Sequence, residues 1–560
     1  MHLSVPDILV FVAYALTILS IGLYVSRDKK GHQKNAEDYF LAGKSLPWWA
    51  IGASLIAANI SAEQFIGMSG SGFAIGLAIA SYEWMAAVTL LVVGKFFLPI
   101  FINKGIYTIP EFVEKRFSTN LKTILAVFWI CLFVFVNLTS VMYLGARALD
   151  TVIGNGDGSL MVYGILGLGL FAAAYSLYGG LSAVAWTDVV QVVLLIVGGL
   201  VTTIMALHQV SPSGGIVDGL VHIYQTVPQK FSMILSKGEI FTPDGKDAWW
   251  DLPGLSVLLG GMWVANLYYW GFNQYIIQRT LAARSLEESQ KGIVFAAFLK
   301  LIIPLIVVIP GIIAYVLNAD AQGVLSTATV DSSFINSEGK IINDNAAPWL
   351  IKQFVPAGLK GLVLAALAAA IVSSLASMLN STATIFTMDI YRPYINPQAT
   401  DKQTVRTGRI TAAVALIIAM FIAPMLGNLG QAFQFIQEYT GVVSPVILAV
   451  FMAGLFFRRA TNNGAIWGVV SSIPIALYFK VAPNGWSTAP VFVNIPFLDQ
   501  MFITCLLSLA IILAVSYFES KTADPKGIPL SRELFRTGPA FNIGATIVLL
   551  ITAVLYVLFW

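Results

Sequence analysis

Fourteen apolar stretches of about 20 residues, each long enough to cross a bilayer as a helix, dominate this chain. They are continuously apolar, so helices are favoured over the alternating strands of a membrane barrel. Charged residues make up 11% of the sequence, against about 25% in soluble domains. We therefore predict an all-α integral membrane protein with 14 transmembrane helices, near residues 5–26, 46–70, 75–102, 122–149, 158–179, 183–207, 253–278, 290–317, 357–388, 408–428, 430–457, 463–482, 498–518 and 540–560.

Lysine and arginine residues lie mainly in the odd-numbered loops between these stretches. Lys115, Arg116, Arg279 and Arg284 are examples, whereas the longer even-numbered loops carry few basic residues and only Arg147 lies close to a span. The fifth loop is too short to carry charge. Because basic loops remain in the cytoplasm, the pattern predicts that both termini face outward. The first stretch lacks the basic start of a cleavable signal peptide and is expected to stay as a helix.

The second stretch is interrupted by polar residues at membrane depth. Asn59, Ser61, Glu63 and Gln64 all fall within residues 51–68. Each polar group there costs on the order of several kcal/mol unless it is satisfied. A hydrophobic span broken midway indicates a transporter binding site, where freed carbonyls face an ion or a solute. The alternative is a kinked helix whose polar groups bond to neighbouring helices.

The seventh stretch repeats part of this pattern. Residues 258–275 contain a glycine-rich start, then Ala265 and Asn266, then aromatic and polar residues, much as Ala58 and Asn59 do five spans earlier. Interrupted helices at corresponding places in two halves of a chain are typical of transporters built from inverted repeats. This repeated pattern therefore favours a core of two related halves with five helices each.

The ninth stretch is rich in small residues and hydroxyls. Close helix packing explains most of the small residues. Ser373 and Ser374 are adjacent, however, so their hydroxyls point about 100° apart on a helix. Two such hydroxyls fit an ion beside the helix better than one helix contact, and carbonyl and hydroxyl oxygens are ligands for hard cations. The sequence therefore predicts a Na⁺ site between this stretch and the break at residues 57–60.

Further polar residues lie on separate apolar stretches. Glu83 and Lys300 are ionisable groups within the third and eighth stretches, which indicates function, although Lys300 could instead extend to the membrane surface. Together with Gln64, Asn266 and Gln437, they would provide donors and acceptors for a polyhydroxylated solute.

Aromatic residues and one more carboxylate complete the candidate set. Tyr268, Tyr269 and Trp270 would provide a ring for a sugar face, or would serve only in packing or interface anchoring. Asp188 begins the sixth stretch and is either functional or a carboxylate that stabilises a helix start.

Long runs of this sequence resemble the sodium:solute symporter family. They are DYFLAGKSLPWWAIGASLIAANISAEQFIGMSGSG, WVANLYYWGFNQYIIQRTLAA, AALAAAIVSSLASMLNSTATIFTMDIY, FIQEYTG and the terminal LFW. The resemblance covers nearly the whole chain and implies a LeuT-like core of two inverted five-helix repeats. It divides the chain into five parts: an extra N-terminal helix with a cytoplasmic loop (1–45), a first repeat (46–207), an external loop (208–252), a second repeat (253–457) and C-terminal helices (458–560). The second repeat contains a further external loop at 318–349.

The resemblance also implies roles for single residues. The Na⁺ ligands would be main-chain and hydroxyl oxygens of Ala57, Ile60, Ala370, Ser373 and Ser374. The hexose would meet the polar side chains of Gln64, Glu83, Asn266, Lys300 and Gln437.

Other implied roles concern the edges of the site. Tyr269 would stack on the sugar and close the inner side, with support from Asn59 and Trp270. The outer side would be closed by Met68, Tyr82 and Phe433. Asp188 would lie on the release path of Na⁺. Ala86 departs from a close family member, which has serine there, so one contact near the sugar is in doubt.

We therefore expect a sodium-coupled symporter that imports a hexose, galactose or glucose, by alternating access across a bacterial inner (plasma) membrane. Na⁺ is the co-transported ion. No organic cofactor, nucleic-acid partner or enzymatic activity is expected, because basic patches and clustered histidines or cysteines are missing from the sequence. The alternatives are a symporter of the same family for myo-inositol, sialic acid or proline, a membrane-embedded enzyme, and a transporter-like sensor. The sequence leaves the oligomeric state open, a homodimer included.

Overall fold

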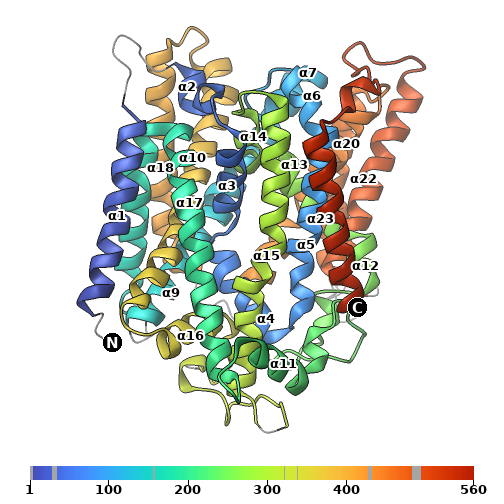
Figure 1. Cartoon of the computed structure of the whole chain (residues 1–560). Coiled ribbons are helices and arrows are strands. Elements are labelled where there is room, and N and C mark those ends of the chain that lie inside the picture. The colour runs from blue at the N-terminus through green and yellow to red at the C-terminus, as the bar shows by residue number, and fades with distance from the viewer. Residues whose placement is uncertain are drawn as a thin grey trace.

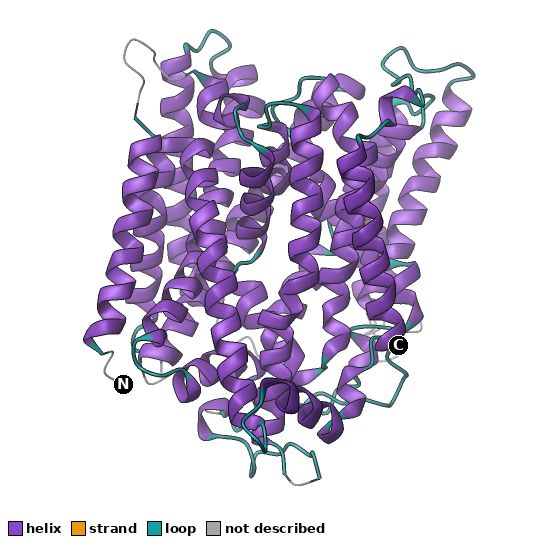
Figure 2. Ribbon diagram, viewed as in Figure 1, coloured by secondary structure: helices purple, strands orange, loops and turns teal. Residues whose placement is uncertain are grey.

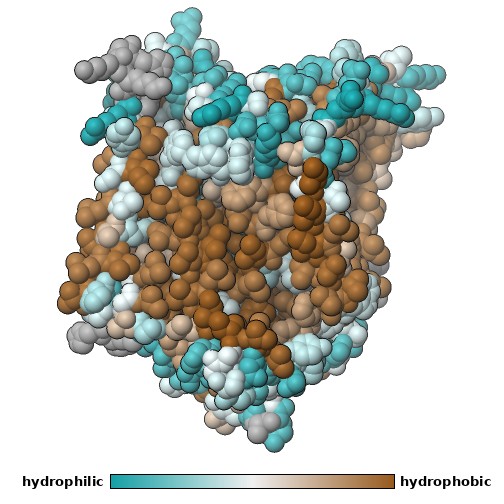
Figure 3. All heavy atoms as spheres, viewed as in Figure 1, coloured by the Kyte–Doolittle hydropathy of each residue, from teal (hydrophilic) through white to brown (hydrophobic). Residues whose placement is uncertain are grey.

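The computed structural model of the chain describes residues 4–27, 35–154, 158–320, 322–336, 338–426, 432–481 and 494–560. In this part of the chain the secondary structure is helical, with isolated β-bridges and no β-strand (Figure 2). On the face that Figure 3 shows, hydrophobic residues form a belt across the middle of the molecule, between two more hydrophilic ends. Such a belt is the surface that a membrane-embedded helical bundle presents to lipid.

The helices of the first half of the chain follow the predicted stretches closely. They are α1 (Val5–Val25), α2 (Ala36–Leu41), η1 (Ala42–Lys44), α3 (Trp48–Asn59), η2 (Glu63–Met68), α4 (Ser69–Ala74), η3 (Leu77–Ala80), α5 (Ser81–Val92), η4 (Val93–Phe97), α6 (Leu98–Asn103), α7 (Ile109–Arg116), α8 (Thr119–Cys131), η5 (Leu132–Leu138), α9 (Thr139–Ile153), α10 (Met161–Val210) and α11 (Ile216–Thr226).

The second half continues in the same manner. Its helices are η6 (Pro228–Phe231), η7 (Ala248–Trp250), α12 (Leu255–Leu259), α13 (Gly261–Phe272), α14 (Gln274–Leu281), α15 (Leu286–Asn318), η8 (Ser332–Phe334), η9 (Asn343–Asn345), α16 (Ala346–Phe354), α17 (Leu359–Ile385), η10 (Phe386–Ile395), α18 (Asp401–Ile422), η11 (Ala423–Leu426), α19 (Ala432–Thr440), α20 (Ser444–Phe456), α21 (Asn462–Val481), α22 (Phe497–Glu519), η13 (Glu533–Phe535) and α23 (Pro539–Leu558). The predicted boundaries at 428, 430 and 482 lie outside the described residues.

Nine helical stretches in the described part of the chain are long and apolar enough to cross a membrane by themselves. The other predicted spans are also helical, but most of them are interrupted or shorter. The predicted spans at 158–179 and 183–207 join in α10, which bends at Gly180 (φ +63°). A Cβ at Gly180 would lie 2.3 Å from the carbonyl oxygen of Tyr39, so only glycine fits this bend.

Long helices surround the interrupted ones. α15 packs against α3, α4 and α5, while α10 packs along α17 and also contacts α3. α13 packs against α5 and α20. Both termini lie at the same end of the bundle as α11 and α16, and α2 and α7 lie at the opposite end (Figure 1). The interrupted helices are therefore enclosed by the bundle near its middle.

A buried lysine fixes the loop between α10 and α12 to the end of α4. The Nζ atom of Lys230 donates to the carbonyl oxygens of Phe73 and Ala74, both at 3.0 Å, and lies 4.0 Å from the ring centre of Tyr315. These carbonyls belong to the C-terminal end of α4, where a positive charge is favourable. Burial away from water nevertheless lowers the pKa of Lys230 to about 7.

This depressed pKa predicts a pH dependence of stability. The Lys230 amine loses its proton near pH 7 when folded, but only near 10.5 when exposed. Between these values the unfolded chain binds more protons, so stability rises with pH, by at most about 1.4 kcal/mol per pH unit for one proton. Lys230→Met is expected to remove this rise in melting temperature, measured by thermal unfolding in detergent. The exposed Lys340 provides the control Lys340→Met, and equal slopes in wild type and Lys230→Met would contradict the prediction.

Candidate solute and cation site

The predicted interruption of the second span is confirmed. α3 ends at Asn59, and Ile60 has an extended backbone (φ −75°, ψ 91°). Ser61 then caps the next helix: the amide of Glu63 donates to its Oγ at 3.1 Å, and its own amide donates to Oε1 of Gln64 at 3.2 Å. These two hydrogen bonds satisfy backbone groups that the break has freed. Ser61, Glu63 and Gln64, which are unusual in an apolar span, therefore stabilise the interruption between the two helices.

The break also exposes main-chain oxygens. The amide of Ser61 donates to the carbonyl of Asn59 at 2.9 Å, and not to the carbonyl of Ala57 four residues before it. The Ala57 carbonyl has therefore lost its usual helical donor. Such a carbonyl can serve as a ligand for a cation.

Ser374 joins the break to α17. Its hydroxyl lies 3.1 Å from the carbonyl oxygen of Ala58 and 3.0 Å from that of Ala370. Because a hydroxyl has one hydrogen, it donates to one of them at a time and keeps lone pairs for another partner. All the residues predicted to bind Na⁺ are buried, namely Ala57, Ile60, Ala370, Ser373 and Ser374.

Ser373 faces a buried ionic cluster. Its hydroxyl donates to Oδ1 of Asp188 at 2.5 Å, and Oδ2 of Asp188 accepts from Ser54 at 2.5 Å and from Nη2 of Arg279 at 3.1 Å. Arg279 also donates to the hydroxyls of Ser54 and Ser377. Asp188 lies well inside α10, so the alternative of a helix-start carboxylate is wrong. The assignment of Arg279 to a basic loop is also wrong, because this residue belongs to α14 and is fully buried.

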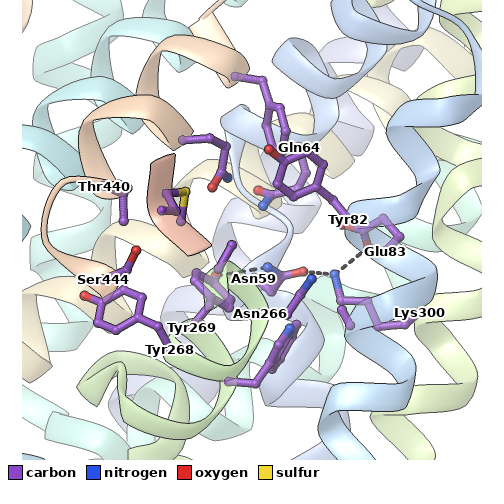
Figure 4. Close-up of a pocket in the computed structure, with 17 residues that line it drawn as sticks. Asn59, Gln64, Tyr82, Glu83, Asn266, Tyr268, Tyr269, Lys300, Thr440 and Ser444 are labelled. Carbon is purple, nitrogen blue, oxygen red and sulfur yellow. Dashed lines mark hydrogen bonds and ion pairs between the residues drawn. The ribbon is translucent and has the colours of Figure 1, made fainter. Parts of the chain in front are cut away.

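A pocket opens beside the break, and its empty volume of about 490 Å³ includes open solvent. Residues from several interrupted helices line it (Figure 4). It brings together every residue that the sequence predicted to contact or support the solute: Asn59, Gln64, Glu83, Asn266, Tyr269, Trp270, Lys300 and Gln437. Ala86 lines it as well.

Lys300 is the centre of the polar contacts in this pocket. Its Nζ donates to Oδ1 of Asn59 and to Oε2 of Glu83, and lies 5.0 Å from the ring centre of Trp270 (Figure 4). Lys300 and Glu83 are almost fully buried. Each offsets the charge of the other, so the pocket contains strong donors and acceptors without a net charge from this pair. The predicted alternative, in which Lys300 extends to the membrane surface, is wrong.

Tyr269 lines the pocket and connects it to α14. Its hydroxyl accepts from Nδ2 of Asn59 at 2.9 Å and from the hydroxyl of Tyr275 at 2.9 Å. On another wall, the rings of Tyr82 and Phe433 meet edge to face at 5.0 Å between their centres. Met68, the third residue predicted on the outer side, is buried but does not line the pocket. The gating roles of these residues stay predictions.

Two further interruptions border the site. The seventh predicted span breaks at Asn273, between α13 and α14, and not at Asn266, which lies inside α13. A third break at residues 441–443 separates α19 from α20 and was not predicted. The sequence signal for it was a glycine and a proline, Gly441 and Pro445, within one apolar run. This break adds lining residues that sequence reasoning missed, namely Thr440, Gly441 and Ser444, and α22 adds Met501.

Comparison with solved structures identifies a similar fold. A Na⁺-coupled sialic acid symporter in a substrate-bound, outward-open state superposes with a TM-score of 0.75 at 24% identity, covering 94% of this chain and 100% of that one. The likeness confirms the all-α, LeuT-like fold.

Sequence relatives cover all or nearly all of the chain. A sodium/glucose cotransporter of Vibrio parahaemolyticus is 59% identical over 100% of this chain and 99% of the relative. The human sodium/myo-inositol cotransporter 2 is 32% identical over 93% of this chain and 77% of the relative. The sheep sodium/glucose cotransporter 1 is 30% identical over 93% and 80%, respectively. The profile of the sodium:solute symporter family matches residues 39–471, and this chain belongs to that family.

Proposed function

We propose that this symporter moves a neutral hexose, galactose or glucose, together with Na⁺. The observation that carries the proposal is the pocket in which the Lys300–Glu83 ion pair and the amides of Gln64, Asn266 and Gln437 meet aromatic rings. Sugar hydroxyls both donate and accept hydrogen bonds, and such a mixture of groups satisfies them. The 59% identity to a sodium/glucose cotransporter supports the same solute class.

Na⁺ would bind where Ser374 joins the break after α3 to α17. The oxygens of this site belong to neutral carbonyls and hydroxyls, and a hard cation prefers oxygen ligands. Bound there, Na⁺ would hold the break against α17 and so orient Asn59, which contacts both Lys300 and Tyr269. Ion binding would thereby complete the hexose site, and coupling follows if Na⁺ prefers the outward-facing state.

The Na⁺ gradient provides enough free energy for this role. One Na⁺ that moves across about 100 mV releases roughly 2.3 kcal/mol, and a tenfold concentration gradient adds about 1.4 kcal/mol. Their sum would support a hexose concentration ratio on the order of several hundredfold.

We place the end that carries both termini outside the plasma membrane, because basic residues concentrate in the opposite loops. Asp188, which contacts Ser373, would then receive Na⁺ on its way inward.

A symporter for myo-inositol is the second candidate, because that solute is also neutral and polyhydroxylated and a named inositol cotransporter is 32% identical. Sialic acid and proline carry carboxylates. Glu83 already neutralises Lys300, so no free cation from this pair is left for an acidic solute.

Uptake into proteoliposomes tests the proposal. An imposed Na⁺ gradient is expected to drive accumulation of radiolabelled galactose or glucose, and the accumulation is expected to disappear when choline replaces Na⁺. Unlabelled galactose, glucose, myo-inositol, proline and sialic acid then serve as competitors. Equal uptake in choline would refute sodium coupling, and stronger competition by myo-inositol than by both hexoses would assign the second candidate.

A further inference from the structure

The first half of α10 leaves a row of side chains uncovered on the outside of the bundle. Tyr163, Leu166 and Leu170 are 73%, 44% and 63% exposed and follow one another at helical spacing. A Cβ at Gly167, within the same row, would meet no atom within 4 Å. We call these four residues the apolar strip of α10.

Two other helices border the apolar strip. The ring centre of Phe171 lies 6.1 Å from that of Tyr14 in α1, and a Cβ at Gly169 would lie 3.1 Å from Cε of Met420 in α18. Figure 1 shows α1, α10 and α18 together on one side of the bundle, and α10 packs against both of the others. The strip therefore runs along a helix between two neighbours, and an acyl chain that lies on it would remove apolar surface from water or loose lipid packing.

Two arginines meet at the end of this half of α10, on the side of the bundle opposite the termini. Nη2 of Arg409, from α18, donates to the carbonyl of Tyr178 at 3.1 Å, and its guanidinium carbon lies 4.9 Å from the centre of the tyrosine ring. A Cβ at the adjacent Gly179 would collide with the hydroxyl of Ser26, the residue that ends α1. Arg27 follows directly, so α1 and α18 each bring an arginine to the same part of α10.

These arginines carry positive charge that the protein does not neutralise. Arg406 lies three residues before Arg409 on the same face of α18 and is exposed, as is Arg27. None of the three forms an ion pair with a residue in the described part of the chain. Glu37 of the nearby α2 pairs with Lys44 instead, at 3.6 Å. An anion from outside the protein would therefore find three arginines available.

From these features we propose that Arg27, Arg406 and Arg409 bind the phosphate of an anionic phospholipid, one acyl chain of which lies on the apolar strip of α10. The planar fork of arginine matches a phosphate with two parallel hydrogen bonds. A zwitterionic lipid would bring its own cation to the site, so three arginines favour a headgroup with net negative charge.

Exposed aromatic residues support a headgroup at this level. Tyr24 lies one turn before the end of α1 and is 72% exposed, and Tyr178 is 43% exposed beside Arg409. Tyrosines are typical of the level at which lipid headgroups lie. The bound lipid would tie α1 to α18 across the end of the first half of α10, whichever solute the symporter moves.

Native mass spectrometry of the full chain in a neutral detergent tests this site. The protein is titrated with dioleoyl phosphatidylglycerol or dioleoyl phosphatidylcholine, and one molecule of the anionic lipid is expected to bind at least about tenfold more tightly than the zwitterionic one. Arg27→Gln combined with Arg406→Gln is expected to weaken this binding at least about tenfold, because each basic residue adds to the attraction of an anionic lipid. Arg409→Lys, which keeps the charge but not the planar fork, is expected to weaken it severalfold.

The matched control is Lys521→Gln combined with Arg532→Gln. Both residues are exposed in the segment between α22 and α23, so the control removes the same charge elsewhere and is expected to keep the wild-type affinity.

Each outcome can be read without reference to transport, because neither Na⁺ nor a solute is present in the titration. Equal affinity for the two lipids would overturn the inference, and so would an unchanged affinity in the Arg27 and Arg406 double variant. The same loss in the Lys521 and Arg532 control would overturn it as a diffuse effect of net charge. A wild-type dimer that dissociates in the Arg27 and Arg406 double variant, with lipid affinity unchanged, would assign this surface to a second copy of the chain.

Discussion

Lys300→Met is expected to reduce Na⁺-driven hexose uptake on the order of a hundredfold or more. The substitution removes the donor to Asn59 and Glu83 and leaves the Glu83 carboxylate buried without its cation. Removal of one partner from a buried ion pair costs about 3–5 kcal/mol. The same change also removes the cation beside Trp270. Uptake into proteoliposomes measures the loss of transport, and thermal unfolding in detergent measures the loss of stability.

A double variant separates folding from solute binding. Glu83→Gln with Lys300→Met leaves no unpaired charge, so its melting temperature is expected to recover relative to Lys300→Met alone, while uptake stays low. Lys291→Met is the matched control, because Lys291 lies on the same helix, is partly exposed and pairs with Glu287 one turn away. Uptake near the wild-type rate in either Lys300 variant would remove this lysine from the solute site.

Local sequence signals predicted the parts of this molecule that neighbouring residues determine. The apolar runs predicted helices because a bilayer requires internally satisfied backbones. Residues 59–64 predicted the break after α3, and Ser61 and Gln64 cap it. Several predicted site residues, among them Glu83 and Lys300, were recognisable because ionisable groups are rare at membrane depth.

Features that depend on distant contacts escaped prediction. Arg279 follows an apolar run and was read as a loop charge, but its partners Asp188 and Ser377 come from α10 and α17. The break in the seventh span lies at Asn273 although Ala265 and Asn266 repeat the earlier motif, since α13 continues past them as a regular helix. Met501 lines the pocket from α22, and no local pattern distinguishes it from other apolar helix residues. Such placements follow from tertiary packing, which a single sequence does not reveal.

Ser374→Ala is expected to raise the Na⁺ concentration for half-maximal uptake about 10- to 100-fold. The Ser374 hydroxyl lies between the carbonyls of Ala58 and Ala370 and is the side-chain oxygen that joins the break to α17. Interactions of a neutral polar group with a charge contribute about 1.5–3 kcal/mol, which corresponds to that range. Hexose uptake as a function of Na⁺ concentration measures the shift.

The control for Ser374→Ala is Thr382→Val on the same helix. The Thr382 hydroxyl is buried and donates to the carbonyl of Met378 in its own helix, at 2.8 Å. Its loss is expected to leave the Na⁺ dependence unchanged. If the hydroxyl of Ser374 binds Na⁺, a saturating Na⁺ concentration should restore most of the hexose uptake in Ser374→Ala, because the carbonyl ligands remain. A variant that keeps the wild-type Na⁺ dependence would show that the cation binds elsewhere, and the break after α3 would then serve the solute alone.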